Sequence, residues 1–565
     1  MPSEADLAAT VAELKRELAA ARRDSEQIRS ALYDLQLDPP EPASGKDASY
    51  RRLVRRIREL VRTSLPSAAR VAVVSKGDDG LLDLYGRQSS HFPQAADGRY
   101  SGYYPKSSLS VVAHLEAMRA QGVEYLLLPA TALWWLDHYP GFFEHLERRY
   151  PRTIDDTDAC VVYSLQERLS PAERPFIELE ELVDELVAIR GEELTVLDWG
   201  FPLPLPAALL DQNVFTAAPD ELDLPYLDSS IDIVLTVAGR DRIAEARRVA
   251  SVATATASGT LAGTGQARTP AVSVRRRPGT KMRLPSVSIV VPCHNEAELT
   301  TACLGSLFET LPQCFDGEIL VVDDASSDET AQLIRAARRR DDRVRGLRNR
   351  TNLGFIESCN RGAMEAQSEY LLFLNNDTIL LPGWLSPLLR TFSDFSDAGV
   401  VGGRLLYTDG RLQEAGGLVF SDGSAAKFGY GDPDADAALY GYVREVDYVS
   451  GALFLTPRSL FSELGGFDRR YGFGFYDDDD YCFAVRVAGR RVYYQPESVV
   501  VHVEGGSAGL DPNVGAKRFQ LANQSIFMAK WKDELARQPP RPDPLDAAAQ
   551  RLLAARGCWN GRGRS

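Results

Sequence analysis

The chain has 565 residues, which predicts about three domains, and its 44% hydrophobic content is enough for buried cores. A net charge of −15 argues against general nucleic-acid binding, so no nucleic acid is expected as a partner. Seven cysteines, none of them in a C-x-x-C pair, favour reduced thiols in a cytosol over a disulfide framework or a zinc site.

The first predicted element is a helix over residues 4–37 with the pattern of a coiled coil. Its seam positions lie alternately four and three residues apart: Leu7, Val11, Leu14, Leu18, Ala21, Ser25, Ile28, Leu32 and Leu35. Burying such a stripe needs a partner surface, so residues 1–38 are predicted to make the protein a homo-oligomer, most simply a dimer. The alternative is a helix that packs on its own chain.

Targeting and membrane signals are weak. The N-terminal sequence "MPSEADLAATVAEL" lacks the apolar region of a signal peptide. The most apolar run, residues 125–136, contains a proline and is too short to span a bilayer. We therefore expect a cytoplasmic protein, and contact with the inner face of a membrane stays open.

Residues 45–168 are predicted to form a small α/β domain. "ARVAVVSKGDDG" has the pattern of a strand and turn, and "SLSVVAHLEAMRAQG" that of a helix. Trp134 and Trp135, which follow a predicted buried strand, are either a sugar-stacking platform or packing.

Residues 169–264 are predicted to form a degenerate Rossmann-like α/β domain. "LTVLDWG" and "LPYLDSSIDIVLTV" resemble the first and fourth strands of a Rossmann-type methyltransferase. Prolines in "LDWGFPLPLP" replace the glycine-rich loop, so a bound cofactor would lack its backbone cradle, and we expect a scaffold without catalysis. Residues 265–285, rich in Pro, Gly and Arg, are predicted to be a linker.

The third domain, residues 286–510, has the densest polar motifs. Three predicted strands end in polar residues: "SVSIVVPCHNE", "GEILVVDDASSDET" and "EYLLFLNNDT". Helical patterns between them predict a mostly parallel sheet with helices on both faces. Ligands bind such sheets at the carboxyl ends of the strands, which is where these polar residues are expected.

Seven segments in order over residues 286–507 resemble the family 2 glycosyltransferases, in particular the rhamnosyltransferase-like branch of bacterial surface-polysaccharide synthesis. They are "VPCHNE", "VVDDASSDET", "NLGFIESCNRG", "FLNNDT", "VSGALFLTPRSLFSELGGFD", "FYDDDDYCFAVRVAG" and "HVEGGS". The resemblance does not cover residues 1–280. It implies the GT-A fold and an inverting transfer of sugar from a UDP or dTDP donor to a glycan or lipid-linked acceptor.

The resemblance also implies roles for single residues. The positions it places around the nucleotide are Pro292, Asn295, Glu296, Asp324, Gly354, Asn360 and Asn376. Asp324 would accept the hydrogen bond of the pyrimidine N3–H. Asn375 stands where the family has the first carboxylate of its D-x-D motif, which leaves Asp377 and His502 as the implied ligands of Mg²⁺ or Mn²⁺. Such a cation stabilises the departing diphosphate as a Lewis acid.

Four consecutive aspartates in "GFGFYDDDDYCFAVR" raise a question, because neighbouring like charges repel. By the family pattern Asp478 is the general base and Asp479 occupies a variable position. Asp477 would help to place the acceptor, and Asp480 would cap the helix that starts here or bind locally. Neighbouring negative charge would raise the pKa of the base and so favour proton capture.

Two alternatives to glycosyl transfer remain. A nucleotidyltransferase usually opens with a glycine-rich loop, which "VPCHNE" lacks. An inactive GT-A scaffold in a larger glycan-assembly complex is supported by Asn375. The tail, residues 511–565, is predicted to be helical and either to pack on the catalytic domain or to cover the acceptor side or touch a membrane.

Overall fold

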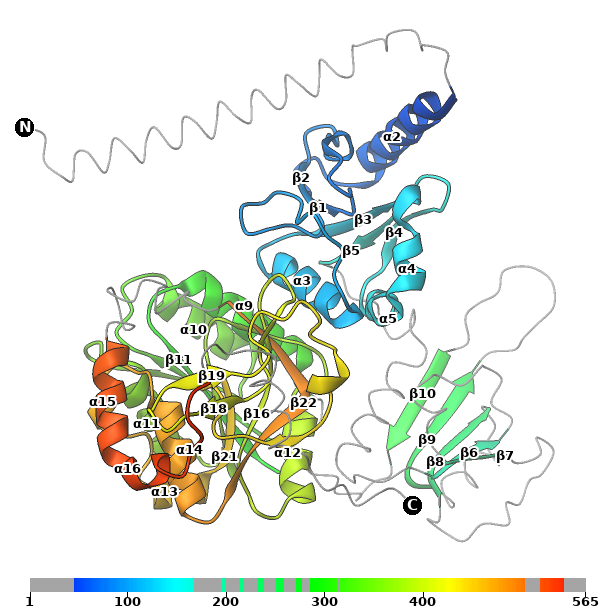
Figure 1. Ribbon diagram of the computed structural model, residues 1–565. Coiled ribbons are helices and arrows are strands. Elements are labelled where there is room, and N and C mark those ends of the chain that lie inside the picture. The colour runs from blue at the N-terminus through cyan, green and yellow to red at the C-terminus, as the bar shows by residue number, and fades with distance from the viewer. Residues whose placement is uncertain are drawn as a thin grey trace, which may run out of the picture. The chain divides into compact units, whose positions relative to one another are not determined.

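A computed structural model describes residues 45–166, 195–199, 213–216, 231–237, 250–258, 271–276, 285–312, 315–503 and 519–542 (Figure 1). The predicted coiled coil of residues 1–38 lies outside these ranges, as does the tail beyond residue 542. No helix among the described residues is both long and apolar enough to cross a membrane.

The N-terminal α/β unit is built on a five-stranded sheet of order β2-β1-β3-β5-β4. Its strands are β1 (Arg70–Val73), β2 (Gln88–His91), β3 (Tyr125–Pro129), β4 (Arg152–Asp156) and β5 (Cys160–Ser164), and its helices are α2 (Gly45–Ser64), α3 (Ser108–Ala120), α4 (Trp134–His138) and α5 (Pro140–Arg149). Strands β2, β1 and β3 run parallel, whereas β5 and β4 are antiparallel additions. The apolar face of α2 packs on this sheet, with Ile57 and Val61 among buried strand residues.

A second five-stranded sheet has the order β10-β9-β8-β6-β7. It contains β6 (Thr195–Trp199), β7 (Asn213–Thr216), β8 (Ile231–Val237), β9 (Ala250–Ser258) and β10 (Ala271–Arg276). Four strands are parallel, and β10 pairs antiparallel with β9. Strand β10 lies inside the predicted linker 265–285, so the linker prediction is wrong for these six residues. Composition alone hid the alternating pattern of "AVSVRR", which suits a strand.

The third sheet, the largest, follows the order β13-β12-β11-β14-β21-β16-β22-β15, with β17 beside β16 and β20 beside β22. Its strands are β11 (Val287–Cys293), β12 (Gly317–Asp323), β13 (Val344–Arg348), β14 (Tyr370–Leu374), β15 (Thr378–Leu380), β16 (Ala398–Leu406), β17 (Leu412–Glu414), β20 (Arg444–Glu445), β21 (Leu453–Pro457) and β22 (Arg491–His502). A small separate ribbon pairs β18 (Gly417–Val419) with β19 (Ala425–Lys427).

The sheet is mixed rather than mostly parallel. Strands β13, β12, β11 and β14 are parallel to one another, but β21 inserts antiparallel between β14 and β16. Strand direction depends on how the long segment between β14 and β21 returns, which the apolar pattern of a strand does not record. The predicted α/β class is confirmed and the strand directions are corrected.

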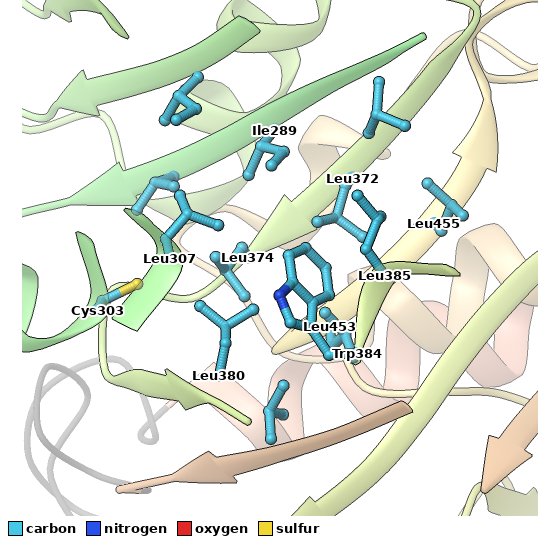
Figure 2. Packing of buried hydrophobic residues seen from close by; sticks show 14 of the residues in the cluster. Ile289, Cys303, Leu307, Leu372, Leu374, Leu380, Trp384, Leu385, Leu453 and Leu455 are labelled. Atoms are coloured by element: carbon cyan, nitrogen blue, oxygen red, sulfur yellow. The ribbon is translucent and has the colours of Figure 1, made fainter. Parts of the chain in front are cut away.

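Helices flank this sheet and bury its apolar strands. They are α9 (Ala297–Thr310), α10 (Thr330–Arg340), α11 (Phe355–Glu365), α12 (Leu385–Asp394), α13 (Arg458–Glu463), α14 (Asp477–Val487), α15 (Gln520–Lys530) and α16 (Lys532–Leu535). On one side Leu307 and Trp384 pack with Leu372 and Leu374 of the central strand (Figure 2). The residues of β14 are almost continuously apolar, as expected of a strand covered on both faces.

The described part of the tail packs on the catalytic domain. Phe527 of α15 and Trp531, which follows it, are buried. Their rings lie with centroids 5.0 and 5.7 Å from that of Phe483 in α14. Of the two expectations for this helix, packing on its own domain is the one observed. The tail therefore supports the helix that begins with the four aspartates.

Candidate active site

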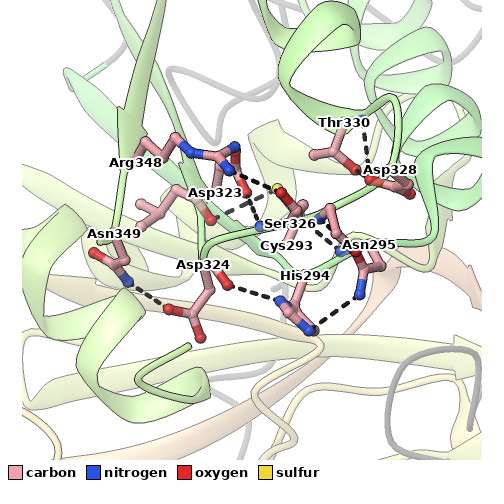
Figure 3. A network of polar contacts seen from close by, with 12 residues as sticks. Cys293, His294, Asn295, Asp323, Asp324, Ser326, Asp328, Thr330, Arg348 and Asn349 are labelled. Atoms are coloured by element: carbon pink, nitrogen blue, oxygen red, sulfur yellow. Dashed lines mark hydrogen bonds and ion pairs between the residues drawn. The ribbon is translucent and has the colours of Figure 1, made fainter. Parts of the chain in front are cut away.

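Two neighbouring loops at the carboxyl ends of β11 and β12 are joined by hydrogen bonds (Figure 3). The Asn295 N–H donates to Ser326 Oγ at 2.8 Å, and Asn295 Oδ1 accepts from the Ser327 N–H at 2.8 Å. Asn295, Glu296 and Ala325 all have positive φ angles, between 55° and 59°. Non-glycine residues rarely adopt this conformation, so these loops are held in shape by the network around them.

Asp324 has a structural role that the sequence did not predict. Its carboxylate accepts hydrogen bonds from Asn349 Nδ2 at 2.7 Å, from the Leu353 N–H at 2.9 Å and from the Gly354 N–H at 2.7 Å. The side chain is buried. Asp324 therefore fixes the loop that leads into α11, and contact with a pyrimidine stays a prediction.

Gly354 is required where this loop meets the segment before α14. Its φ angle is +89°, and an added Cβ would lie 2.8 Å from Phe473 Cδ1 and 2.9 Å from Phe473 Cα. The next residue, Phe355, donates its N–H to the Phe473 carbonyl at 3.3 Å. The loop predicted to approach the nucleotide is thus packed against the loop that carries the aspartates.

The other residues predicted to line the nucleotide pocket differ in accessibility. Pro292 is buried within β11, and Glu296 is exposed at the start of α9. Asn360 is buried, and its amide exchanges two hydrogen bonds of 2.9 Å with the backbone of Phe467. Asn376 is also buried and donates to Thr300 Oγ1 at 3.0 Å. The amides of Asn360 and Asn376 therefore brace the fold around the site.

The predicted metal ligands meet beside the end of β14. Strand β15 pairs with β22 so that Thr378 faces His502, which brings His502 Nε2 to 3.2 Å from Asp377 Oδ1. Asn375 Nδ2 lies 3.4 Å from the same ring nitrogen. The buried Asn375 Oδ1 has no hydrogen-bond partner among the described residues. Two residues separated by more than a hundred positions thus form one polar cluster with Asn375.

Gln413, which the sequence analysis missed, orients the histidine. Its Oε1 lies 2.8 Å from His502 Nδ1, and the side chain is completely buried in β17. Because an amide oxygen only accepts, Nδ1 carries the proton, and a neutral ring then turns its Nε2 lone pair toward Asp377. A cation bound between Nε2 and the Asp377 carboxylate would satisfy both groups.

The donor set fits a divalent cation bound together with a substrate. No three His, Cys, Asp or Glu side chains cluster as a metal site within the described ranges. The chain would supply Asp377 and His502, and the Asn375 oxygen would join them after a rotation of the amide, whose nitrogen faces His502. Mg²⁺ and Mn²⁺ commonly take one or two protein carboxylates and complete their shell with substrate phosphates and water, so a partial protein set is sufficient.

The four aspartates at the start of α14 have different surroundings. Asp477 and Asp479 are buried, and burial followed by the charge of Asp478 raises the pKa of both well above its usual range. Asp478 is the one that is not fully buried. It accepts the Gly451 N–H at 3.1 Å and the Asp479 N–H at 3.0 Å. Only Asp478 therefore combines a fixed position with access from outside.

Asp480 corrects a prediction, because it neither caps the helix nor binds locally. Its carboxylate accepts from Tyr471 Oη at 2.8 Å, Lys530 Nζ at 2.7 Å and Trp531 Nε1 at 2.7 Å. Two of these partners belong to the tail. The tail also contributes Asn523, which donates to the Tyr471 and Gly474 carbonyls at 2.8 Å. Asp480 thus anchors α14 to the tail, while Asp478 stays partly accessible.

A fifth carboxylate, Glu414 of β17, lies near Asp478 and was not predicted. Ser450 donates its N–H to Glu414 Oε1 at 3.0 Å, and the next N–H, of Gly451, goes to Asp478. Burial raises the pKa of Glu414 to about 7, with Lys427 opposing and Asp478 adding to the shift. Its Oε2 has no partner in the described part of the chain. No motif in "LQEAGG" signals this residue.

The catalytic domain matches the model of "Glycosyl transferase family 2" over residues 288–447. Among curated relatives, the uncharacterized protein y4gI of Sinorhizobium fredii is 26% identical over 255 residues, 44% of this chain and 28% of that protein. The O-antigen biosynthesis protein RfbC of Myxococcus xanthus is 28% identical over 232 residues, 40% of this chain and 18% of that protein. The chain therefore spans less than a third of the length of these two relatives.

A third relative is matched over more of its length. The N-acetylglucosaminyl-diphospho-decaprenol L-rhamnosyltransferase of Mycobacterium tuberculosis is 30% identical over 215 residues, 34% of this chain and 69% of that protein. A solved structure of GalNAc-T7 with UDP, GalNAc and Mn²⁺ covers 45% of this chain and 49% of that one, at 20% identity and a TM-score of 0.38. On the family match and the Mycobacterium relative together, the chain belongs to glycosyl transferase family 2.

Proposed function

We propose that this protein transfers a sugar, with inversion, from a nucleoside diphosphate donor to a glycan or lipid-linked glycan acceptor. The observation that carries the proposal is the meeting of Asp377, His502 and Asn375 at a strand end, in a domain whose Asp478 is held by two backbone N–H groups. One cluster suits a diphosphate-bound cation and the other a general base. Together they supply the two functions of a metal-dependent, inverting glycosyl transfer.

Asp377 and His502 would hold Mg²⁺ or Mn²⁺ with help from the Asn375 oxygen. When bound, the cation neutralises charge on the departing diphosphate. Gln413 keeps the ring of His502 in the orientation that such binding needs. A histidine ligand favours Mn²⁺ slightly over Mg²⁺. The donor nucleotide is proposed to be UDP or dTDP.

Asp478 is proposed to accept the proton of the acceptor hydroxyl. The hydroxyl oxygen attacks the anomeric carbon, its proton moves to the Asp478 carboxylate, and the bond from that carbon to the diphosphate oxygen breaks. One displacement with one base inverts the anomeric configuration. Two backbone N–H groups fix the carboxylate, and burial raises the pKa of Asp477 and Asp479 well above the usual range, which favours their neutral forms beside it.

The biological setting is proposed from the names of the relatives. RfbC is named for O-antigen biosynthesis, and the Mycobacterium relative for rhamnose transfer to a decaprenol-linked sugar. We propose a role in bacterial surface-polysaccharide synthesis, in the cytoplasm or at the inner face of the membrane. Thermal-shift screening of UDP-, dTDP- and GDP-sugars would identify the donor, because bound ligand stabilises the native state.

An inactive scaffold is the second candidate, and the substitution of an amide, Asn375, for a carboxylate favours it. Donor hydrolysis with and without Mn²⁺ separates the two functions. A scaffold would bind nucleotide sugar without turning it over under any metal condition. An active enzyme would release nucleoside diphosphate in the presence of Mn²⁺, and faster when the acceptor is present.

The experiment that tests the base compares Asp478→Asn with Asp479→Asn. The first variant should cut single-turnover sugar transfer by about 10²–10⁴-fold. It also loses one of two backbone hydrogen bonds, which costs about 1 kcal/mol of stability, so donor affinity by calorimetry checks that the site is intact. Asp479 is buried, and burial raises its pKa well above the usual range, so its amide variant, which imitates the neutral acid, should stay within a few-fold of wild type. Normal transfer by the first variant would assign the base to another residue.

A further inference from the structure

An exposed group of aromatic rings lies at the carboxyl ends of the parallel strands of the N-terminal unit. Tyr103, Tyr104 and Trp134 are 45%, 42% and 38% exposed. Trp134 follows β3 and starts α4, whereas its neighbour Trp135 is completely buried. Trp135 thus packs in the core and leaves Trp134 at the surface. This edge of a parallel α/β sheet is the place where ligands bind.

The surface ring of Trp134 is held on several sides. The Tyr104 ring meets it edge-on with centroids 5.4 Å apart, and the His138 ring lies at the same distance. Lys76 Nζ lies 5.4 Å from the Trp134 ring centroid and donates to the Thr131 carbonyl at 2.7 Å. A ring fixed in this way loses little side-chain entropy when a ligand stacks on it.

Polar groups lie next to these rings. Ser75, beside Lys76 in sequence, has its Oγ 2.6 Å from His91 Nδ1. His91 Nε2 in turn lies 3.2 Å from Asp79 Oδ1. The Asp79 side chain is 91% exposed. The Tyr100 and His91 rings meet edge to face, with their centroids 6.1 Å apart. The exposed Lys76 therefore places a cation over the Trp134 ring, and Asp79, three residues further along the chain, adds an exposed carboxylate.

The composition of this surface fits a sugar better than a protein partner. Within residues 45–166, the exposed large hydrophobic side chains are all aromatic: Tyr103, Tyr104, Trp134 and Phe143. Protein interfaces are also rich in Tyr and Trp, so the polar Lys76 and His138 beside the Trp134 ring are what favour a sugar here. A pyranose ring instead presents an apolar C–H face to an aromatic ring and directs its hydroxyls sideways. Flanking amine, carboxylate and imidazole groups can bind those hydroxyls.

We propose that the surface formed by Lys76, Asp79, Tyr103, Tyr104 and Trp134 binds a glycan, with a pyranose stacked on Trp134 and the nearly perpendicular Tyr104 ring beside it. None of these residues is among the carboxylates or the metal ligands of the glycosyltransferase domain. The proposal stands whether or not the catalytic domain turns over nucleotide sugars, because it depends only on residues 75–138.

Saturation-transfer difference NMR on the full chain tests this proposal without any activity measurement. The probes are methyl α-L-rhamnopyranoside, methyl β-D-galactopyranoside and diacetylchitobiose. We expect saturation of the ring protons of at least one probe by the wild-type chain. Trp134→Ala and Tyr104→Ala should each weaken that binding at least tenfold in a titration. Trp134→Phe, which keeps an aromatic face, should retain most of it and controls for loss of folding.

Two results would overturn the proposal. One is the absence of saturation transfer to all three probes, which would leave the aromatic surface to a protein partner or to another part of this chain. The other is equal binding by wild type and by the alanine variants, which would place the sugar elsewhere. Circular dichroism of each variant distinguishes a lost site from a lost fold, and Trp134→Phe gives the answer where the alanine variant unfolds.

Discussion

Glu414→Gln should make the protein more stable at alkaline pH and change it little at acidic pH. Burial raises the pKa of Glu414 to about 7 in the folded chain, above the ordinary value of 4.5. Between these pH values the unfolded chain releases a proton that the folded chain keeps, so wild-type stability falls as the pH rises. The amide variant imitates the protonated acid. Its carbonyl oxygen can still accept the Ser450 N–H.

The size of the effect follows from the two pKa values. Their difference corresponds to about 3 kcal/mol of stability that wild type loses between pH 4.5 and about 7. For a domain of this size that is roughly 6–12 °C in melting temperature. Calorimetric melting of wild type and Glu414→Gln at pH 5 and pH 8 measures this effect. Asp477 and Asp479 are present in both proteins, so their contributions cancel in the comparison. If the melting temperatures of wild type and variant changed with pH in parallel, folding would not raise the pKa of Glu414, and the reasoning would be refuted.

Three further predictions concern the metal, the tail and the assembly. Asp377→Ala and His502→Ala should each weaken Mn²⁺ binding in calorimetric titrations and lower donor turnover. If both variants kept the wild-type Mn²⁺ affinity and turnover, the metal site would lie elsewhere. Lys530→Met should destabilise the catalytic domain by about 3 kcal/mol in denaturant unfolding, because it leaves the buried Asp480 without its cation, and Lys532→Met serves as the control. Deleting residues 1–38 should lower the mass measured by light scattering to that of a monomer; an unchanged mass would mean that this helix does not mediate assembly.

The amino-acid sequence alone was enough to predict the features that are local in the chain. Apolar runs ending in polar residues predicted β11, β12 and β14, because a buried strand and the loop after it differ sharply in polarity. The run of aspartates predicted the start of α14. The motifs predicted the family, which the comparisons confirm. The role of each site residue was available only through that resemblance.

Only the tertiary structure determined what lies beside what. His502 reaches Asp377 because β15 pairs with β22, and Gln413 orients that histidine from a third strand. Glu414 joins Asp478 through two consecutive N–H groups of one turn. Asp480 binds the tail, and Trp134 is exposed while Trp135 is buried. Each of these facts depends on packing between segments far apart in the chain, which neither periodicity nor composition can record.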